Sequence, residues 1–268
     1  MITSPTNSTI KEIRRLRDRS ARQASGLAYV EGIRQVIEAG KGQDVIERVV
    51  YCDTLLTSSL ARDWLKQAQR SGTPVLEVNA DVFSRLAMKE SPVGLAAVVR
   101  QKWSALPGVL APADVWVALD AIADPGNLGT ILRTLDASAG MGVILLDAST
   151  DPYDPTSIRA SMGAVFTKKL VRTTLPVFSD WIDRHRISLI GASDRGAQDY
   201  YNFPYPSPCV IMLGSERHGL SEAHLALCRQ VVAIPMSGNC DSLNLAVAAS
   251  LILYEIYNQR RLSGGAKE

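Results

Sequence analysis

Several residue patterns that mark large protein classes are missing from this chain. Its four cysteines form no CxxC pair, which argues against a zinc ribbon or a thioredoxin-like redox motif. They stand at Cys52, Cys209, Cys228 and Cys240. Two disulfides are arithmetically possible, but we favour four reduced thiols and therefore a cytoplasmic protein.

Long apolar runs are also lacking. The longest, such as residues 143–146 and 210–213, are far too short to cross a membrane. The N-terminal stretch MITSPTNSTIKEIRR contains no apolar run, so we expect no signal peptide. We therefore expect no membrane partner.

Common nucleotide-binding and hydrolase signatures are absent too. There is no GxxxxGK[ST] loop and no GxSxG elbow, and the glycines of residues 139–142 lack the third glycine of GxGxxG. His218 and His224 are six residues apart, which is not a metal-ligand spacing on a helix face, and His185 has no obvious nucleophile partner. We expect all three to be surface histidines, and we expect no bound metal.

The composition is that of a globular protein with a substantial core. The chain has 268 residues, 46% of them hydrophobic and 21% charged, and this length favours two domains. Residues 1–107 carry 16 Lys+Arg against 11 Asp+Glu, a net of +5, whereas residues 108–268 carry 13 against 16, a net of −3. The total of +2 excludes a broadly polybasic protein, but it allows a local basic patch.

Much of the positive surplus lies in residues 11–22, KEIRRLRDRSAR. The apolar stripe of Ile10, Ile13 and Leu16 predicts that this segment is one helix. The helix can be a solvated face or a patch that contacts RNA phosphates, and the charge asymmetry favours the second interpretation. The candidate RNA-binding residues are Arg14, Arg15, Arg19 and Arg22.

Short apolar segments alternate with amphipathic ones along both halves of the chain. Strands are predicted at residues 46–51, 74–78, 94–100, 115–119, 143–146, 189–192, 210–213 and 231–234, and helices at 61–70, 80–87, 128–138, 155–164 and 243–260. Fully apolar strands that alternate with helices indicate an α/β fold with a parallel sheet covered on both faces. We expect a smaller N-terminal α/β domain over residues 1–104, a linker over 105–112 and a second domain over 113–268.

Three predicted loops stand where open α/β sheets bind their ligands, beyond the carboxyl ends of strands. They are DAIADPGNLGTILRT at 120–134, LGSERHGL at 213–220 and IPMSGNCDSLN at 234–244. Each polar residue in them also has an ordinary structural explanation. Asn127, Ser242 and Asn244 are good helix caps, Glu216 suits a helix dipole, and Arg133 can be a surface charge.

Taken together, the loops are more specific. Asn127-x-Gly129-x-x-x-Arg133-Thr134, then LGSERHGL, then IPM-x-G-x-x-x-SLN resemble the three ordered motifs of the SpoU/TrmH family of RNA ribose 2′-O-methyltransferases, in the SPOUT superfamily. RASMGA at 159–164 and the ending LNLAVAASLILYEIYNQR resemble this family's intervening segment and terminal helix. The N-terminal half resembles, more loosely, the small ribosomal-protein-like RNA-binding domain that many members carry.

This resemblance implies a fold, a cofactor and an assembly. The C-terminal domain would be a parallel-sheet methyltransferase domain with a trefoil knot, whose loops bind S-adenosylmethionine. Members are usually homodimers in which the partner completes each site. By motif position, the cofactor contacts would fall at Leu213, Gly214, Ile234, Met236, Leu243 and Asn244.

The resemblance also implies that Arg133, Glu216 and Asn244 are catalytic, supported by Asn127 and Ser242. The reaction would be attack of a ribose 2′-hydroxyl on a sulfonium methyl. A guanidinium keeps its proton near pH 7, so we favour Arg133 as a stabiliser of the target phosphate or developing alkoxide, oriented by Glu216. A role for Arg133 as the general base stays open. Leu135 and Ser138 depart from the family pattern, which leaves the target-entry surface undetermined.

The prediction is therefore a cytoplasmic, homodimeric, S-adenosylmethionine-dependent RNA 2′-O-methyltransferase. The N-terminal half favours rRNA over tRNA as the substrate. The alternatives are a tRNA 2′-O-methyltransferase and a non-catalytic RNA-binding protein that retains the fold, and the complete catalytic set argues against the latter.

Overall fold

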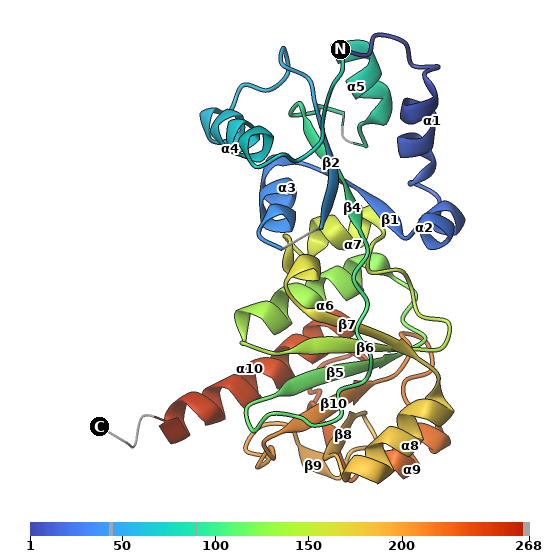
Figure 1. Ribbon diagram of the computed structural model, residues 1–268. Coiled ribbons are helices and arrows are strands. Elements are labelled where there is room, and N and C mark those ends of the chain that lie inside the picture. The colour runs from blue at the N-terminus through green and yellow to red at the C-terminus, as the bar shows by residue number, and fades with distance from the viewer. Residues whose placement is uncertain (43–44, 89, 265–268) are drawn as a thin grey trace. The chain divides into compact units, whose positions relative to one another are not determined.

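The computed structural model describes residues 1–42, 45–88 and 90–264, which form two compact units. Unit 1 comprises Met1–Lys102 together with Asp151–Thr167, and unit 2 comprises Trp103–Thr150 and Lys168–Glu268 (Figure 1). The first division lies close to the predicted one at residue 104. The return of residues 151–167 to unit 1 was not predicted, and the predicted linker belongs to unit 2, where the indole N–H of Trp181 donates to the Pro107 carbonyl at 2.7 Å.

Unit 1 is a four-stranded sheet, in the order β1-β4-β2-β3, with helices packed on it. The β1–β4 and β4–β2 pairs are antiparallel, and β2–β3 is parallel. The elements are α1 (Ser8–Arg15), α2 (Arg19–Ser25), β1 (Leu27–Glu31), α3 (Ile33–Gly40), β2 (Ile46–Tyr51), α4 (Ser59–Arg70), β3 (Val75–Glu77), α5 (Ala80–Leu86), β4 (Leu95–Arg100), α7 (Pro155–Ala160) and the 3-10 turn Ala164–Phe166. The predicted small α/β domain is thus present.

The basic segment forms two helices instead of the single predicted one. Helix α1 ends at Arg15 with Leu16 as its C-cap, and α2 begins after the N-cap residue Asp18. Ile10, Ile13 and Leu16 are buried, as the apolar stripe predicts, so burial of this stripe anchors α1 to the unit 1 core. The break between the helices sends their charged side chains in different directions.

Arg22 lies inside unit 1, which corrects its prediction as an RNA-binding residue. Its side chain is 2% exposed, and Nε donates to Asp151 Oδ2 at 2.7 Å while Nη2 lies 3.3 Å from Asp154 Oδ2. Nη1 donates to the carbonyls of Leu16 and Arg17 at 3.1 and 2.7 Å. Arg22 therefore ties the break between α1 and α2 to the start of the returning segment. Arg14, Arg15 and Arg19 are exposed and stay candidates for RNA contact.

Unit 2 contains the predicted parallel sheet. Its seven strands lie in the order β7-β6-β5-β10-β8-β11-β9, and every neighbouring pair is parallel. The elements are β5 (Val115–Asp120), α6 (Pro125–Ala137), β6 (Gly142–Leu146), β7 (Lys169–Thr173), α8 (Leu175–His185), β8 (Leu189–Ala192), β9 (Gln198–Asp199), β10 (Cys209–Leu213), α9 (Glu222–Leu227), β11 (Gln230–Ala233) and α10 (Leu245–Gly264). Strands β6 and β10 are buried throughout, as expected of strands covered on both faces.

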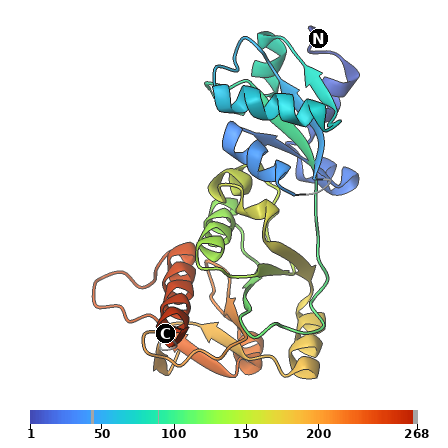
Figure 2. The same cartoon turned by 60° about the vertical axis from the view of Figure 1, so that its left-hand side comes forward.

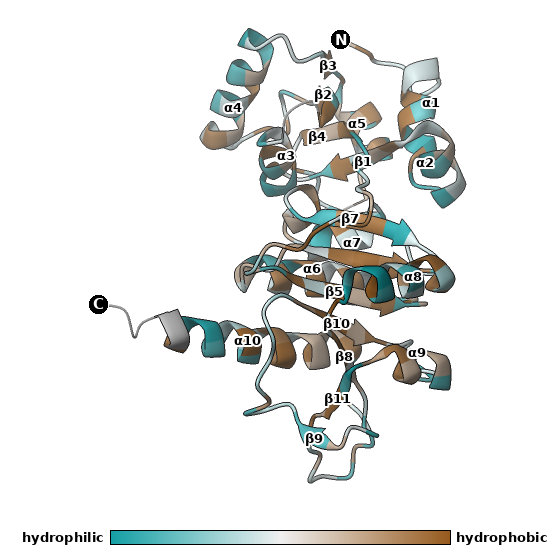
Figure 3. Cartoon of the chain, turned by 60° about the horizontal axis from the view of Figure 1, so that its bottom comes forward, coloured by the Kyte–Doolittle hydropathy of each residue, from teal (hydrophilic) through white to brown (hydrophobic). Residues whose placement is uncertain are grey.

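The hydropathy of unit 2 follows this layering. Figure 3 shows the central strands in the apolar colour, with apolar segments continuing along α10. Figure 2 shows the chain between β11 and α10 as a wide irregular excursion before α10 begins. Within the residues that the structure describes, no helix is long and apolar enough to span a membrane.

Candidate functional site

The candidate site lies where the strand order of unit 2 changes direction. From β5 the chain proceeds to β6 and β7 on one side, whereas β10, β8 and β11 lie on the other side. The loops that follow adjacent parallel strands β5 and β10 therefore meet at the same edge of the sheet. A crevice at such a switch point is the usual ligand site of an open α/β sheet.

Glu216 joins these two loops. It follows β10, and its carboxylate accepts hydrogen bonds from the backbone amides of Ala123 at 3.1 Å and Asp124 at 3.3 Å, in the loop after β5. Asn127 Nδ2 donates to Glu216 Oε1 at 3.3 Å. Partial burial alone would raise the pKa of Glu216, but these hydrogen bonds and one from its own amide outweigh burial and hold the pKa below its usual range. Glu216 is therefore an anion at neutral pH.

Asn244 brings the third loop to the same point. Its Nδ2 donates to Asn127 Oδ1 at 3.0 Å, and its Oδ1 accepts from the amides of Ala246 at 2.9 Å and Val247 at 3.3 Å. Asn244 thus caps the first turn of α10 while it holds Asn127. Asn127 does not cap α6, because Asp124 is the N-cap and accepts from the Asn127 amide at 2.9 Å. The structure therefore unites Glu216, Asn127 and Asn244 in one network.

Arg133 and Ser242 stand outside this network. Arg133 is exposed on α6 and makes no hydrogen bond or ion pair with any residue that the structure describes. The predicted bond from Glu216 to Arg133 is not formed, because the carboxylate of Glu216 is already occupied by the two amides and by Asn127. The guanidinium is consequently free to meet an anionic ligand. Ser242 is exposed in the third loop and does not cap α10.

The residues predicted to contact a cofactor divide by burial. Leu213 is 2% exposed within β10, whereas Ile234 is half-buried, and Met236 and Leu243 are 41% and 37% exposed. Apolar side chains held open on a loop suit the flat apolar face of an adenine ring. The chain's own residues therefore fit S-adenosylmethionine, with Met236 and Leu243 available to cover the adenine.

Gly214 has a structural task that its prediction as a cofactor contact did not include. A Cβ atom at this position would lie 1.9 Å from the carbonyl oxygen of Gly219, in the turn where Ser215 pairs with Gly219. The turn after β10 thus excludes any side chain at Gly214. A larger residue would displace the loop that carries Glu216, whether or not a ligand is bound.

A buried histidine at the same edge of the sheet was missed from the sequence. His224 is 5% exposed, which corrects its prediction as a surface histidine. Its Nδ1 accepts from the Ser221 amide at 3.2 Å in a capping box of α9, so the neutral ring carries its proton on Nε2, which lies 3.7 Å from Asp120 Oδ2. Burial raises the pKa of Asp120, with the charge of Asp147 adding to the effect and His224 opposing it. The S-x-x-H spacing at 221–224 was the available signal.

One face of α10 exposes large apolar side chains next to the network. Val247 is 48% exposed, Leu251 36% and Tyr254 45%. Together with Tyr201, Asn127 and Asn244 they line a groove of about 680 Å³. Thr134 on α6 and Ser250 on α10 form a hydroxyl pair at 2.9 Å, which fixes α10 against α6.

Comparisons with known proteins match both units. The SpoU rRNA Methylase family matches residues 114–254, and the MRM3-like substrate binding domain matches residues 7–97. A 23S rRNA (uridine(2479)-2′-O)-methyltransferase of Streptomyces viridochromogenes is 33% identical over 253 residues, covering 91% of this chain and 87% of the relative. A 23S rRNA (guanosine(2553)-2′-O)-methyltransferase of Bacillus subtilis is 28% identical over 95% of this chain and 98% of the relative.

Solved structures agree with the sequence comparisons. An AdoMet-bound rRNA methyltransferase from Sinorhizobium meliloti has a TM-score of 0.87 and 32% identity, over 96% of this chain and 97% of that one. The SpoU methyltransferase AviRb from Streptomyces viridochromogenes, in complex with AdoMet, has a TM-score of 0.84 and 30% identity, over 95% of this chain and 98% of that one.

Proposed function

This chain belongs to the SpoU rRNA methylase family, and on that premise we propose that it transfers the methyl group of S-adenosylmethionine to a ribose 2′-hydroxyl of ribosomal RNA. The observation that carries the proposal is the site at the switch point of unit 2. There, Glu216, Asn127 and Asn244 lock three loops together, and the charge of Arg133 stays unpaired beside them.

The residues of this chain perform three tasks in the reaction. The cofactor supplies an electrophilic methyl group on a sulfonium. The ribose oxygen bonds to this carbon as the carbon–sulfur bond breaks, and the hydroxyl proton is released. Arg133 stabilises the negative charge that develops on the ribose oxygen or the neighbouring phosphate, which requires its guanidinium to stay protonated. Glu216 and Asn244 hold the loops in place, so that reactants meet in a fixed geometry.

Ribosomal RNA is favoured over tRNA because the similarity extends through unit 1. Both curated rRNA methyltransferases match nearly the whole chain, and the substrate binding domain matches residues 7–97. By contrast, a structure described as methylating C/U34 on tRNA covers only 57% of this chain, with a TM-score of 0.52. Unit 1 is thus supported as the part that selects an rRNA substrate.

Methyl transfer to isolated RNAs tests this function. The protein, labelled S-adenosylmethionine and either total rRNA or total tRNA are incubated, and the labelled site is mapped by resistance to alkaline cleavage, which a 2′-O-methyl group blocks. We expect labelled rRNA and no label with Arg133→Ala. Label on tRNA alone would overturn the rRNA assignment, and label on a base would overturn the ribose assignment.

We also propose that the protein is a cytoplasmic homodimer with a trefoil knot in unit 2. The exposed apolar side chains Val247, Leu251 and Tyr254 on α10 support the dimer, since a large apolar face is typical of an interface. Similarity to SpoU structures supports the knot. All four cysteines lie among the described residues and are unpaired, which supports a reducing compartment.

Light scattering after size-exclusion chromatography tests the dimer. We expect the mass of two chains for the wild type and of one chain for Leu251→Asp, because a buried carboxylate would lose its hydration in the interface. Leu60→Asp is a matched control, since Leu60 is 64% exposed on α4 of unit 1. A monomeric wild type would refute the dimer.

A further inference from the structure

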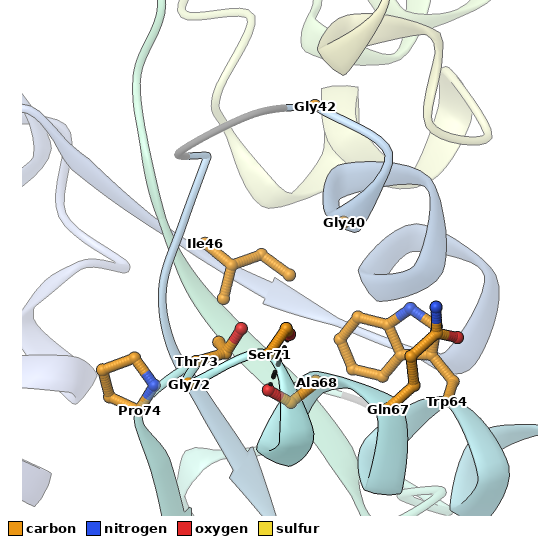
Figure 4. A pocket seen from close by; sticks show the side chains of 10 residues that line it. All are labelled: Gly40, Gly42, Ile46, Trp64, Gln67, Ala68, Ser71, Gly72, Thr73 and Pro74. Carbon is orange, nitrogen blue, oxygen red and sulfur yellow. Dashed lines mark hydrogen bonds between the residues drawn. The ribbon is translucent and has the colours of Figure 1, made fainter.

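Unit 1 contains a pocket that the methyl-transfer site does not use. It has a volume of about 350 Å³ and lies between the end of α3, the start of β2, the second half of α4 and the turn that leads into β3 (Figure 4). Its lining residues are Gly40, Gly42, Ile46, Trp64, Gln67, Ala68, Ser71, Gly72, Thr73 and Pro74. This volume is within the range of small-ligand sites.

Trp64 is the aromatic wall of the pocket, and it is fixed in place. A Cβ atom at Gly40 would lie 2.8 Å from Cζ2 of Trp64, so the indole packs directly on the backbone of α3. The ring is half-buried and is directed toward the pocket, with Ile46 and Thr73 across from it (Figure 4). An indole held in this way offers a preformed stacking surface and loses little conformational entropy when a ligand binds.

The polar groups around this wall have unused hydrogen-bonding capacity. Ser71 is satisfied, because its hydroxyl donates to the Ala68 carbonyl at 2.9 Å (Figure 4). Within the described part of the chain, the indole N–H of Trp64, the amide of Gln67 and the hydroxyl of Thr73 have no partner. One donor and two groups that both donate and accept therefore surround the aromatic wall.

None of the lining residues carries a charge, whereas cations flank them in the sequence. Lys41 lies between Gly40 and Gly42, and Arg70 lies just before Ser71, and both are exposed. Lys41 pairs with Glu38 at 2.8 Å, but an exposed pair of this kind is weak and can be exchanged for a phosphate. An uncharged aromatic pocket between two cations suits a neutral planar ring attached to a phosphate backbone.

We propose that this pocket binds one unstacked nucleobase of the RNA substrate, stacked on Trp64 and hydrogen-bonded at its edge by Gln67 and Thr73. Proteins read RNA sequence mainly from bases splayed out of single strands and loops, with an aromatic side chain as the platform. The inference rests on the proposed function for the identity of the ligand as RNA. It adds a second point of contact, in unit 1, at which single-stranded RNA is distinguished from duplex.

The test compares affinity for single-stranded poly(U) and poly(A) with affinity for the poly(A)·poly(U) duplex, using the full-length protein. We expect Trp64→Ala to weaken binding of at least one single strand by about 5- to 150-fold, the scale of losing one stacked base, and to leave duplex binding unchanged. Trp64→Phe should restore most of the affinity, because it keeps an aromatic face. Leu60→Ala on the same helix is the matched control. Equal losses for both single strands and duplex, or no loss, would overturn the pocket.

A second pair of variants keeps the test decisive if Trp64→Ala unfolds. Gln67→Ala and Thr73→Val leave the packing on Gly40 intact, and at least one of them should weaken single-strand binding several-fold. Wild-type affinity in both would also overturn the proposal. Methyl transfer measured in parallel separates this inference from the proposed function. A wild type that methylates no RNA, yet binds single strands in a Trp64-dependent way, would refute the function and leave the pocket standing.

Discussion

Replacing Arg22 with alanine should destabilise unit 1 strongly, although Arg22 belongs to the most basic segment of the chain. The guanidinium is buried, and it is bonded to Asp151 at 2.7 Å and to two backbone carbonyls in the break between α1 and α2. Its removal leaves the Asp151 side chain, which is 3% exposed, as a buried charge that keeps only the amide of Tyr153 as a partner.

The expected magnitude follows from this environment. Breaking a buried ion pair by deleting one partner costs about 3–5 kcal/mol, because the remaining charge is uncompensated. A free energy of unfolding is commonly about 5–15 kcal/mol, so the loss is a large fraction of the total. Replacing both partners, as in Arg22→Met with Asp151→Leu, should recover much of the loss, since no buried charge then remains.

Urea unfolding followed by circular dichroism measures the loss, and hydrogen exchange locates it. Exchange should accelerate in unit 1 peptides, including β1 and α7, while β5 and β10 stay protected. Arg14→Ala, an exposed neighbour, is the control and should change the free energy of unfolding by less than about 0.5 kcal/mol. If Arg22→Ala unfolds like the control, the reasoning about the buried pair is refuted.

Three further outcomes are expected. Arg133→Ala should keep cofactor affinity and stability while methyl transfer falls by about 10²-fold or more, and Arg133→Lys should stay poor; near-full turnover of the lysine variant would exclude a planar, bidentate role. Glu216→Gln should lower the unfolding midpoint at pH 7. Because the folded pKa of Glu216 is below the unfolded value of about 4.3, this difference should vanish as pH falls through the folded pKa; a difference that persists in acid would contradict the network. Replacing Arg14, Arg15 and Arg19 with alanine should flatten the log–log salt dependence of RNA binding by about 0.7–0.9 per lost contact, and an unchanged slope would identify them as a solvated face.

Apolar runs made the architecture of unit 2 predictable. Strands β6 and β10 are continuous apolar segments, so a parallel sheet covered on both faces could be expected, and it is confirmed. Strand β7, KLVRT, was missed because it lies at the edge of the sheet and mixes charged with buried residues. The break between α1 and α2 was missed because the apolar stripe runs through Leu16, and only the tertiary bonds of Arg22 show where the helix stops.

The candidate site was predictable as a set of loops and not as a set of contacts. The ordered motifs identified Asn127, Glu216 and Asn244, and these three are bonded to one another. Which partner Glu216 takes depends on the backbone amides of Ala123 and Asp124, whose positions no side-chain pattern encodes. The burial of His224 depends likewise on how α9 packs at the end of β5.

The path of the chain constrains how this protein can be recombined with its relatives. The chain passes between the two units after Lys102, Thr150 and Thr167, so unit 1 is encoded in two separate stretches, the second embedded within the region that matches the methylase family. A crossover at residue 102 would give a hybrid the Arg22 of one parent and the Asp151 of the other. Such a hybrid is viable only if both parents keep compatible charges at the two positions. Exchange of substrate preference between relatives therefore requires residues 151–167 to travel with the N-terminal half.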